Sequence, residues 1–237
     1  MNIAIDIGNT FVKIGYFESN ELIDNKVFRV EEIDWKSIFM GENLSVIVSA
    51  SGSITAEMRK NLDSINGSVH LFTHNSKMPI SIEYETPKTL GLDRIAGGVG
   101  ANVLFPESKV LVIDAGTAIT YDFMDGNVFK GGNISPGLSL RYKSLNYYTA
   151  QLPLGTPPSD FMIYGKNTND AIGRGVYNGL LYEIEETIHK FKEVEENISV
   201  VLTGGESHFF VNKIKRTIFA KPNLVLIGLN RILTYNA

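Results

Sequence analysis

Short apolar runs separated by polar turns mark the start of the chain. Residues 3–7 and 12–17 form two such runs, joined by the polar turn Gly8-Asn9-Thr10. Strand-length apolar runs on either side of a Gly-containing turn predict a β-hairpin. A helix is expected over 54–65, where apolar residues recur at helical spacing. Further strands are expected at 22–30, 44–51 and 69–72. This order of elements predicts a mixed α/β lobe.

The hairpin turn gathers groups that suit a magnesium nucleotide. Asp6 brings a carboxylate, Thr10 a hydroxyl and Lys13 an ammonium group, and the turn itself offers backbone amides. Amides and a cation match phosphate oxygens, and a carboxylate matches the coordination shell of Mg²⁺. A hairpin that merely needs Gly and Asn for its backbone would explain the same residues, so both interpretations stay open from this stretch alone.

The design of the hairpin returns about half a chain later. The run 110–120 is again an apolar strand, a turn of Asp114, Gly116 and Thr117, and a second strand. Such an internal repeat predicts two similar lobes, at 1–108 and 109–237, whose two turns contact one nucleotide. This duplication resembles the ATPase fold shared by acetate and sugar kinases, Hsp70 and actin. The expected fold class is therefore α/β, a duplicated actin-like or ribonuclease H-like ATPase fold with mixed five-stranded sheets and flanking helices.

Composition narrows the possible functions. The chain has 237 residues, 43% of them hydrophobic, and a net charge of −4. The absence of a basic block argues against a nucleic-acid partner. No cysteine is present, which excludes thiolate metal sites, and the four histidines are scattered. No apolar run approaches the roughly 20 residues of a membrane span, and the N-terminus lacks the pattern of a signal peptide. We expect a cytoplasmic protein.

A second candidate site precedes a Gly-rich helix expected at 92–104. Asp93 and Arg94 lie at the start of that helix, where backbone N–H groups and the guanidinium favour an anion. The alternative is that Asp93 only caps the helix and Arg94 is its surface partner. The many glycines of this helix predict close backbone packing against another element.

The rest of the chain predicts further elements of the second lobe. An apolar stripe at 172, 176, 180, 184 and 188 marks a long helix over 169–194, next to a small-residue stripe of Ala171, Gly175 and Gly179. The other elements expected are a helix at 138–148, a strand at 198–203, a helix from Glu206, a last strand at 224–227 and a last helix at 229–235.

Six motifs in order resemble those of the type III pantothenate kinases, over the whole length of the chain. They are Asp6-x-Gly-Asn-Thr-x-x-Lys13, Tyr84-x-x-Pro87, Gly91-x-Asp93-Arg94, Asp114-x-Gly-Thr117, Gly131-Gly-x-Ile-x-Pro-Gly137 and Thr203-Gly-Gly205. The resemblance implies ATP-dependent phosphorylation of pantothenate to 4'-phosphopantothenate, the first step of coenzyme A biosynthesis. It also implies a homodimer, with the long helix at its interface.

The resemblance assigns roles to individual residues. Asp93 would be the general base, Asp114 a ligand of a monovalent cation (K⁺ or NH₄⁺), and Asp6 a ligand of the Mg²⁺ that accompanies ATP, through water. The ATP-binding set would be Asp6, Ile7, Gly8, Asn9, Thr10, Phe11, Val12, Lys13 and Thr117. The pantothenate-binding set would be Tyr84, Gly91, Leu92, Asp93, Arg94 and Thr168, with Thr168 reaching its own or the partner's site.

Two alternatives to this function stay open. One is a different small-molecule kinase of the same superfamily. The other is a non-catalytic transcriptional regulator or binding protein derived from it, which predicts a lost Asp93 or a basic surface. The sequence shows neither feature.

Overall fold

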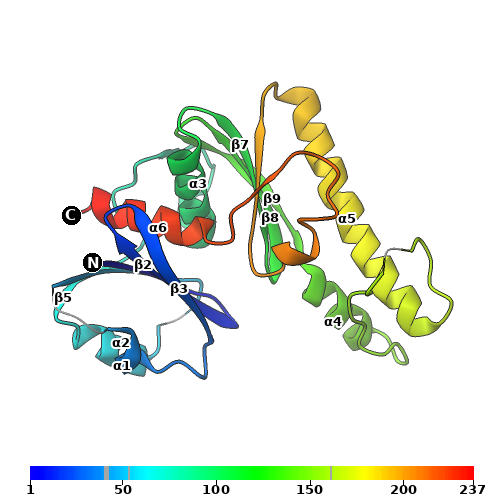
Figure 1. Ribbon diagram of the computed structural model, residues 1–237, viewed down its shortest axis with the longest axis horizontal. Coiled ribbons are helices and arrows are strands. Elements are labelled where there is room, and N and C mark those ends of the chain that lie inside the picture. The colour runs from blue at the N-terminus through cyan, green and yellow to red at the C-terminus, as the bar shows by residue number, and fades with distance from the viewer. Residues whose placement is uncertain (40–42, 53, 161) are drawn as a thin grey trace. The chain divides into compact units, whose positions relative to one another are not determined.

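The computed structural model describes residues 1–39, 43–52, 54–160 and 162–237 (Figure 1). The chain forms two compact units. Unit 1 contains Met1–Ser108, Met124–Gly131 and Asn223–Ala237, and unit 2 contains Lys109–Phe123 and Gly132–Pro222. The division into lobes at 1–108 and 109–237 stays a prediction. No helix in the described part of the chain is long and apolar enough to cross a membrane.

Unit 1 is built on a five-stranded sheet with the strand order β3-β2-β1-β4-β5. The expected hairpin is confirmed, because β1 and β2 pair antiparallel across the Gly8 turn, and β3 continues the meander. β4 and β5 add in parallel on the other side of β1. The strands are β1 (Asn2–Ile7), β2 (Phe11–Glu18), β3 (Glu21–Arg29), β4 (Leu44–Ala50) and β5 (Gly67–Leu71).

Alternate residues of these strands build a core on one face of the sheet. Ile3, Ile5 and Ile7 of β1 lie there with their neighbours on β2 and β4, and Trp35 and Met58 pack against them. The two latter residues belong to the short helix α1 (Trp35–Ile38) and to α2 (Ala56–Asp63). Thr55 caps α2 by accepting a hydrogen bond from the amide of Met58.

Two helices, α3 (Leu92–Leu104) and α6 (Leu224–Tyr235), pack against each other at the other face of this sheet (Figure 1). Their approach needs glycine. A Cβ on Gly100 would lie 2.3 Å from the carbonyl oxygen of Leu224, and one on Gly228 would lie 1.8 Å from that of Ala96. The close packing expected for the glycine-rich helix is therefore confirmed.

The strand expected at 224–227 and the separate helix at 229–235 are wrong, because the whole segment is the single helix α6. Its first residues, Leu224, Val225 and Leu226, are all buried. A continuous apolar run of this length does not distinguish a buried strand from a buried helix.

The second sheet has six strands in the order β11-β10-β7-β8-β9-β6, one more than expected. The additional strand is β6, which pairs with the start of β9 inside unit 1. In unit 2, β7 and β10 pair in parallel. The strands are β6 (Ser81–Ile82), β7 (Lys109–Ala115), β8 (Ala118–Asp125), β9 (Val128–Pro136), β10 (Ser199–Thr203) and β11 (Phe219–Ala220).

Unit 2 also contains α4 (Leu138–Tyr148) and the 27-residue helix α5 (Thr168–Val194), both close to the expected bounds. Leu180, Ile184 and Ile188 of α5 are buried in the core of this unit, so the apolar stripe of the helix is covered within the unit. Ala171, Gly175 and Gly179 are exposed. The helix expected from Glu206 is only the single 3₁₀ turn η2 (Ser207–Phe209), and a similar turn, η1 (Pro87–Thr89), precedes α3.

Candidate functional site

The β1–β2 hairpin places the first candidate phosphate loop at the end of a buried strand. Asn9 and Thr10 are exposed at the turn, and the amide of Gly8 donates to the carbonyl of Phe11 at 2.9 Å, which closes it. Asp6 lies directly opposite Lys13 in the β1–β2 register. Residues paired in this way project from the same face of a sheet, so the structure brings this carboxylate and this ammonium group together.

Three further residues of the expected ATP-binding set have other surroundings. The side chains of Ile7 and Val12 are buried in the apolar core of unit 1. Phe11 is exposed, and the guanidinium of Arg29 lies 5.7 Å from its ring centre. Only the backbone of Ile7 and Val12 is therefore available to a ligand at this turn.

The pantothenate-type motif forms the first turn of α3. The carboxylate oxygen Oδ1 of Asp93 accepts a hydrogen bond from the amide of Arg94 at 2.9 Å. A Cβ on Gly91, at the N-cap position, would lie 2.4 Å from the same oxygen, so a side chain there would displace the carboxylate. His74 fixes the preceding residue by donating from Nε2 to the carbonyl of Leu90 at 2.8 Å.

Arg94 is not a surface partner of Asp93. It is only 7% exposed, and its guanidinium lies 5.8 Å from the ring centres of both Tyr84 and Phe129. These two rings meet edge to face at 6.4 Å. A cation held over aromatic rings is stabilised electrostatically and is fixed in place. The interpretation of Asp93 as a helix cap is right in part, because one of its oxygens bonds the helix amide, whereas the interpretation of Arg94 as a surface group is wrong.

The second candidate phosphate loop connects β7 and β8 in unit 2. Asp114 is half-buried, Thr117 is exposed, and the amide of Gly116 donates to the carbonyl of Ala118 at 3.0 Å. Gly137 packs against this loop: its amide donates to the carbonyl of Thr117, and a Cβ on it would lie 2.0 Å from the carbonyl oxygen of Gly116.

A Gly-Gly turn supports the same loop from β10. Gly204 has a φ of +94°, and a Cβ there would lie 2.3 Å from the carbonyl oxygen of Ala115 and 2.4 Å from Oδ1 of Asp114. Gly205, next to it, faces open space. Gly137 and Gly204, one from each of two expected motifs, therefore both pack against the Asp114 loop.

Sequence reasoning missed Glu206, which joins this turn to α4. Its amide donates to the carbonyl of Ala115 at 2.8 Å. Its carboxylate accepts from the amides of Leu138 and Ser139, at 2.9 and 3.2 Å, and from the hydroxyl of Ser139. Because the N-cap residue, Gly137, has no side chain, Glu206 supplies the cap that α4 lacks. No local pattern indicates a cap from a residue so distant in sequence.

A partly buried ion pair between Arg141 and Glu183 anchors the residues just before Gly137. Arg141 donates to Oε2 of Glu183 at 2.5 Å, to the carbonyl of Pro136 at 2.7 Å and to the hydroxyl of Ser135 at 3.0 Å. Tyr121 donates to the same carboxylate at 2.9 Å. Burial and the nearby charge of Glu183 raise the pKa of Tyr121 well above its usual value, so this hydroxyl remains a donor.

Thr168 is the exposed first residue of α5 and belongs to unit 2, with Asp114 and Thr117. Asn167 caps the helix by accepting from the amide of Asp170 at 2.9 Å. The other candidate residues named above, from Asp6 to Arg94, belong to unit 1.

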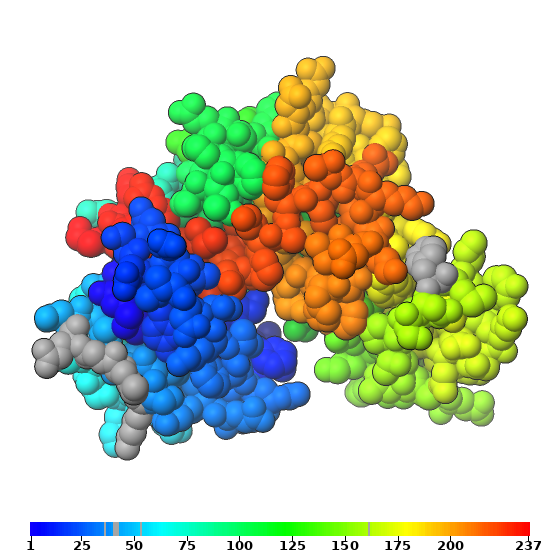
Figure 2. Space-filling view, viewed as in Figure 1, coloured from blue at the N-terminus to red at the C-terminus, as the bar shows by residue number. Residues whose placement is uncertain are grey.

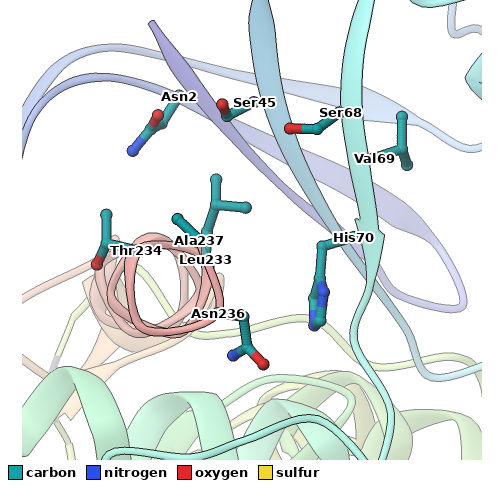
Figure 3. Close-up of a pocket in the computed structure, with 9 residues that line it drawn as sticks. All are labelled: Asn2, Ser45, Ser68, Val69, His70, Leu233, Thr234, Asn236 and Ala237. Atoms are coloured by element: carbon teal, nitrogen blue, oxygen red, sulfur yellow. The ribbon is translucent and has the colours of Figure 1, made fainter.

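A cavity of about 270 Å³ lies in unit 1 at the end of the first sheet away from the Asp6–Thr10 loop (Figure 3). Asn2, Ser45 and Ser68 line it at the amino ends of β1, β4 and β5, and Asn236 and His70 complete its polar wall. Ligands of open α/β sheets bind at the carboxyl ends of the parallel strands. This cavity is therefore separate from the candidate loop at Asp6–Thr10.

Metal binding at the candidate loops would depend on single carboxylates. Within the described ranges, no group of three or more His, Cys, Asp or Glu side chains could hold a metal ion. Mg²⁺ fits such a site, because it binds through one or two carboxylates and completes its shell with water and substrate phosphates.

Solved structures with the same fold define the class. A candidate Baf family transcriptional activator from Campylobacter jejuni matches with a TM-score of 0.64 and 20% identity, over 99% of this chain and 98% of that one. A candidate 2-dehydro-3-deoxygalactonokinase from Sinorhizobium meliloti matches with a TM-score of 0.60 and 11% identity, over 99% of both chains. The fold is that of the actin-like and sugar-kinase ATPases.

Sequence comparison defines the family within this class. A family model described as type III pantothenate kinase matches residues 2–190. The type III pantothenate kinase of Flavobacterium johnsoniae is 40% identical over 240 residues, which cover 99% of this chain and 98% of the relative. The chain belongs to the type III pantothenate kinase family.

Proposed function

We propose that this protein transfers the γ-phosphoryl group of ATP to the primary hydroxyl of pantothenate, giving 4'-phosphopantothenate in the first step of coenzyme A biosynthesis. Membership of the family supports the reaction. The observation that carries the assignment of the site is the first turn of α3, where Asp93 lies next to the aromatic-bound Arg94.

Asp93 acts as the general base. Its Oδ1 is held by the amide of Arg94, which fixes the carboxylate, and the substrate hydroxyl approaches the other oxygen. As the bond from the hydroxyl oxygen to phosphorus forms, the proton moves to Asp93 and the bond from phosphorus to the β-phosphate oxygen breaks. A fixed base contributes through alignment as well as through proton transfer.

Pantothenate binds at Tyr84 and Gly91–Arg94, and Thr168 contributes from α5. Pantothenate is an anion at neutral pH, and the amino end of α3 and the guanidinium of Arg94 both favour negative charge. The guanidinium of Arg94 lies over the rings of Tyr84 and Phe129, and these contacts hold it in one place.

ATP binds to both loops. The amides of residues 7–13, the hydroxyls of Thr10 and Thr117, and the ammonium group of Lys13 contact its phosphates. Asp6 would hold Mg²⁺ through water, and Asp114 would hold K⁺ or NH₄⁺; when bound, these cations would supply positive charge for the phosphate oxygens. The half-buried carboxylate of Asp114 beside phosphates supports a bound cation, since the two negative groups would otherwise repel each other.

We further propose that the protein is a homodimer that works in the cytoplasm, without a nucleic-acid or membrane partner. Part of the surface of unit 2 supports the dimer. The exposed stripe of Ala171, Gly175 and Gly179 leaves room for a second helix, because a Cβ on either glycine meets nothing within 4 Å. Figure 2 shows the neighbouring residues 150–160 and 162–165 at the surface. Large apolar side chains exposed nearby are Tyr147, Tyr148, Leu154, Ile163, Tyr164 and Tyr182.

The test of the reaction is ADP release by the pure protein with pantothenate, compared with a panel of sugars, acetate and glycerol. We expect release with pantothenate alone. Release with a sugar or acetate but not with pantothenate would favour another kinase of the superfamily. No release with any acceptor would favour a regulator.

A further inference from the structure

Ser49 is a buried polar residue that the mechanism above does not use. It is the sixth residue of β4 and is 1% exposed. Within the described part of the chain, its hydroxyl has no hydrogen-bond partner. Buried hydroxyls almost always have a partner, so one without any indicates a water or ion that the bare chain does not contain.

The register of the sheet places Ser49 beside the first candidate phosphate loop. Asp6 on β1 pairs with Lys13 on β2 and with Ser49 on β4. The alternate residues of these strands, such as Ile5 and Val48, form the apolar core on the other face. Lys13, Asp6 and Ser49 therefore form one row across the carboxyl end of β1, with Asp6 in the middle.

The chemistry of this row suits hydrated Mg²⁺. The carboxylate of Asp6 alone is too small a donor set for the ion, which keeps several of its waters. A water bound to a divalent cation is a strong hydrogen-bond donor, and the oxygen of Ser49 is an acceptor without a donor. Ser49 is almost fully buried, which favours a partner as small as a single water over a phosphate group.

We propose that Ser49 is a positioning residue for the nucleotide-bound metal: its Oγ accepts a hydrogen bond from a water of the Mg²⁺ shell and holds that water against Asp6. This inference rests on the proposed function, since it takes the loop at Asp6 as the site of Mg·ATP. It assigns a role in metal binding to β4, which pairs with β1 on the side away from β2.

The test compares Ser49→Ala with Ser45→Ala. Ser45 lies on the same strand and the same face, four residues earlier and about 13 Å away, and pairs with Asn2 at the amino end of β1. The same atom is removed in both variants, but only Ser49 lies beside Asp6. Calorimetric titration measures binding of ATP with Mg²⁺ and, separately, with EDTA. Mn²⁺ titration followed by electron paramagnetic resonance reports the metal directly in the presence of ATP.

We expect Ser49→Ala to weaken binding of Mg·ATP about tenfold or more, as for a hydrogen bond to a charged group. Binding of ATP in EDTA should not change, and Mn²⁺ affinity should fall by a similar factor. The melting temperature of the free protein should stay the same or rise, because the variant removes a buried hydroxyl without a partner. Ser45→Ala should match the wild type in every measurement.

Equal binding of Mg·ATP by both variants would overturn the proposal. So would equal weakening with and without Mg²⁺, because that result assigns Ser49 to phosphate or to packing. If the wild type binds Mg·ATP but does not phosphorylate pantothenate, the proposed reaction is wrong. The titrations alone then decide whether Ser49 positions the metal. A wild type that binds no Mg·ATP overturns both.

Discussion

The turn after β10 offers a sharp test of how the second phosphate loop is held. Gly204→Ala should disrupt this loop, whereas Gly205→Ala should not. At Gly204 the φ of +94° is unfavourable for alanine by about 1–2 kcal/mol. Its Cβ would also lie 2.3 Å from the carbonyl oxygen of Ala115 and 2.4 Å from Oδ1 of Asp114. Relieving such an overlap typically adds about 1–3 kcal/mol. The sum is about 2–5 kcal/mol.

The effect of Gly204→Ala on ATP binding depends on which part of the protein must move to accommodate the new Cβ. The Cβ contacts backbone at Ala115, so the Asp114 loop itself has to shift, and ATP binding should fall together with stability. Thermal unfolding, measured with and without Mg·ATP, should show a melting temperature lower by about 5–15 °C and a smaller increase on adding nucleotide. Gly205→Ala, which meets open space, should stay within about 0.5 kcal/mol of the wild type. Equal melting temperatures and equal ATP affinities for the two variants would refute the reasoning.

Two further predictions concern the cation and the dimer. The rate should rise with K⁺ and be weak in Na⁺ or Tris at constant ionic strength, and Asp114→Asn should remove this dependence; a rate indifferent to K⁺ counts against a cation at Asp114. Light scattering should give about twice the chain mass of 26.2 kDa. Gly179→Leu, on the exposed stripe of α5, should yield a folded monomer, while Gly179→Ala should remain dimeric. If Thr168 reaches the partner's site, mixing Asp93→Asn with Thr168→Ala should restore up to about a quarter of wild-type activity; a fully active monomer would exclude this exchange.

Local patterns predicted much of the fold. The hairpin at Gly8, the glycine-rich helix α3 and the long helix α5 each depend on turn residues or on a clear apolar period, and all three are present. The segment 224–235 was mispredicted because its apolar run is buried on several sides and has no distinctive period. β6 is only two residues long, and no local pattern indicates its pairing with β9, which lies far along the chain.

In the candidate site, too, some features could be predicted from the sequence and others could not. Asp6 and Lys13 are close in sequence on a tight hairpin, so their proximity could be predicted. Ser49 and Glu206 could not be identified, because the first depends on the parallel register of β1 and β4 and the second on a cap of α4 from 68 residues away. The burial of Arg94 against Tyr84 and Phe129 likewise results from the pairing of β6 with β9, and no spacing in the sequence indicates it.

The central claim is that Asp93 is the base of a pantothenate kinase. It is tested most directly by pantothenate-dependent ADP release, measured for the wild type and for Asp93→Asn at saturating Mg·ATP. The substitution keeps the size of the side chain and an oxygen that can bond the amide of Arg94, and it removes the proton acceptor. The account predicts turnover by the wild type and a loss of about 10²-fold or more in the variant, with unchanged melting temperature and ATP affinity. Near-normal turnover by pure Asp93→Asn protein would contradict it.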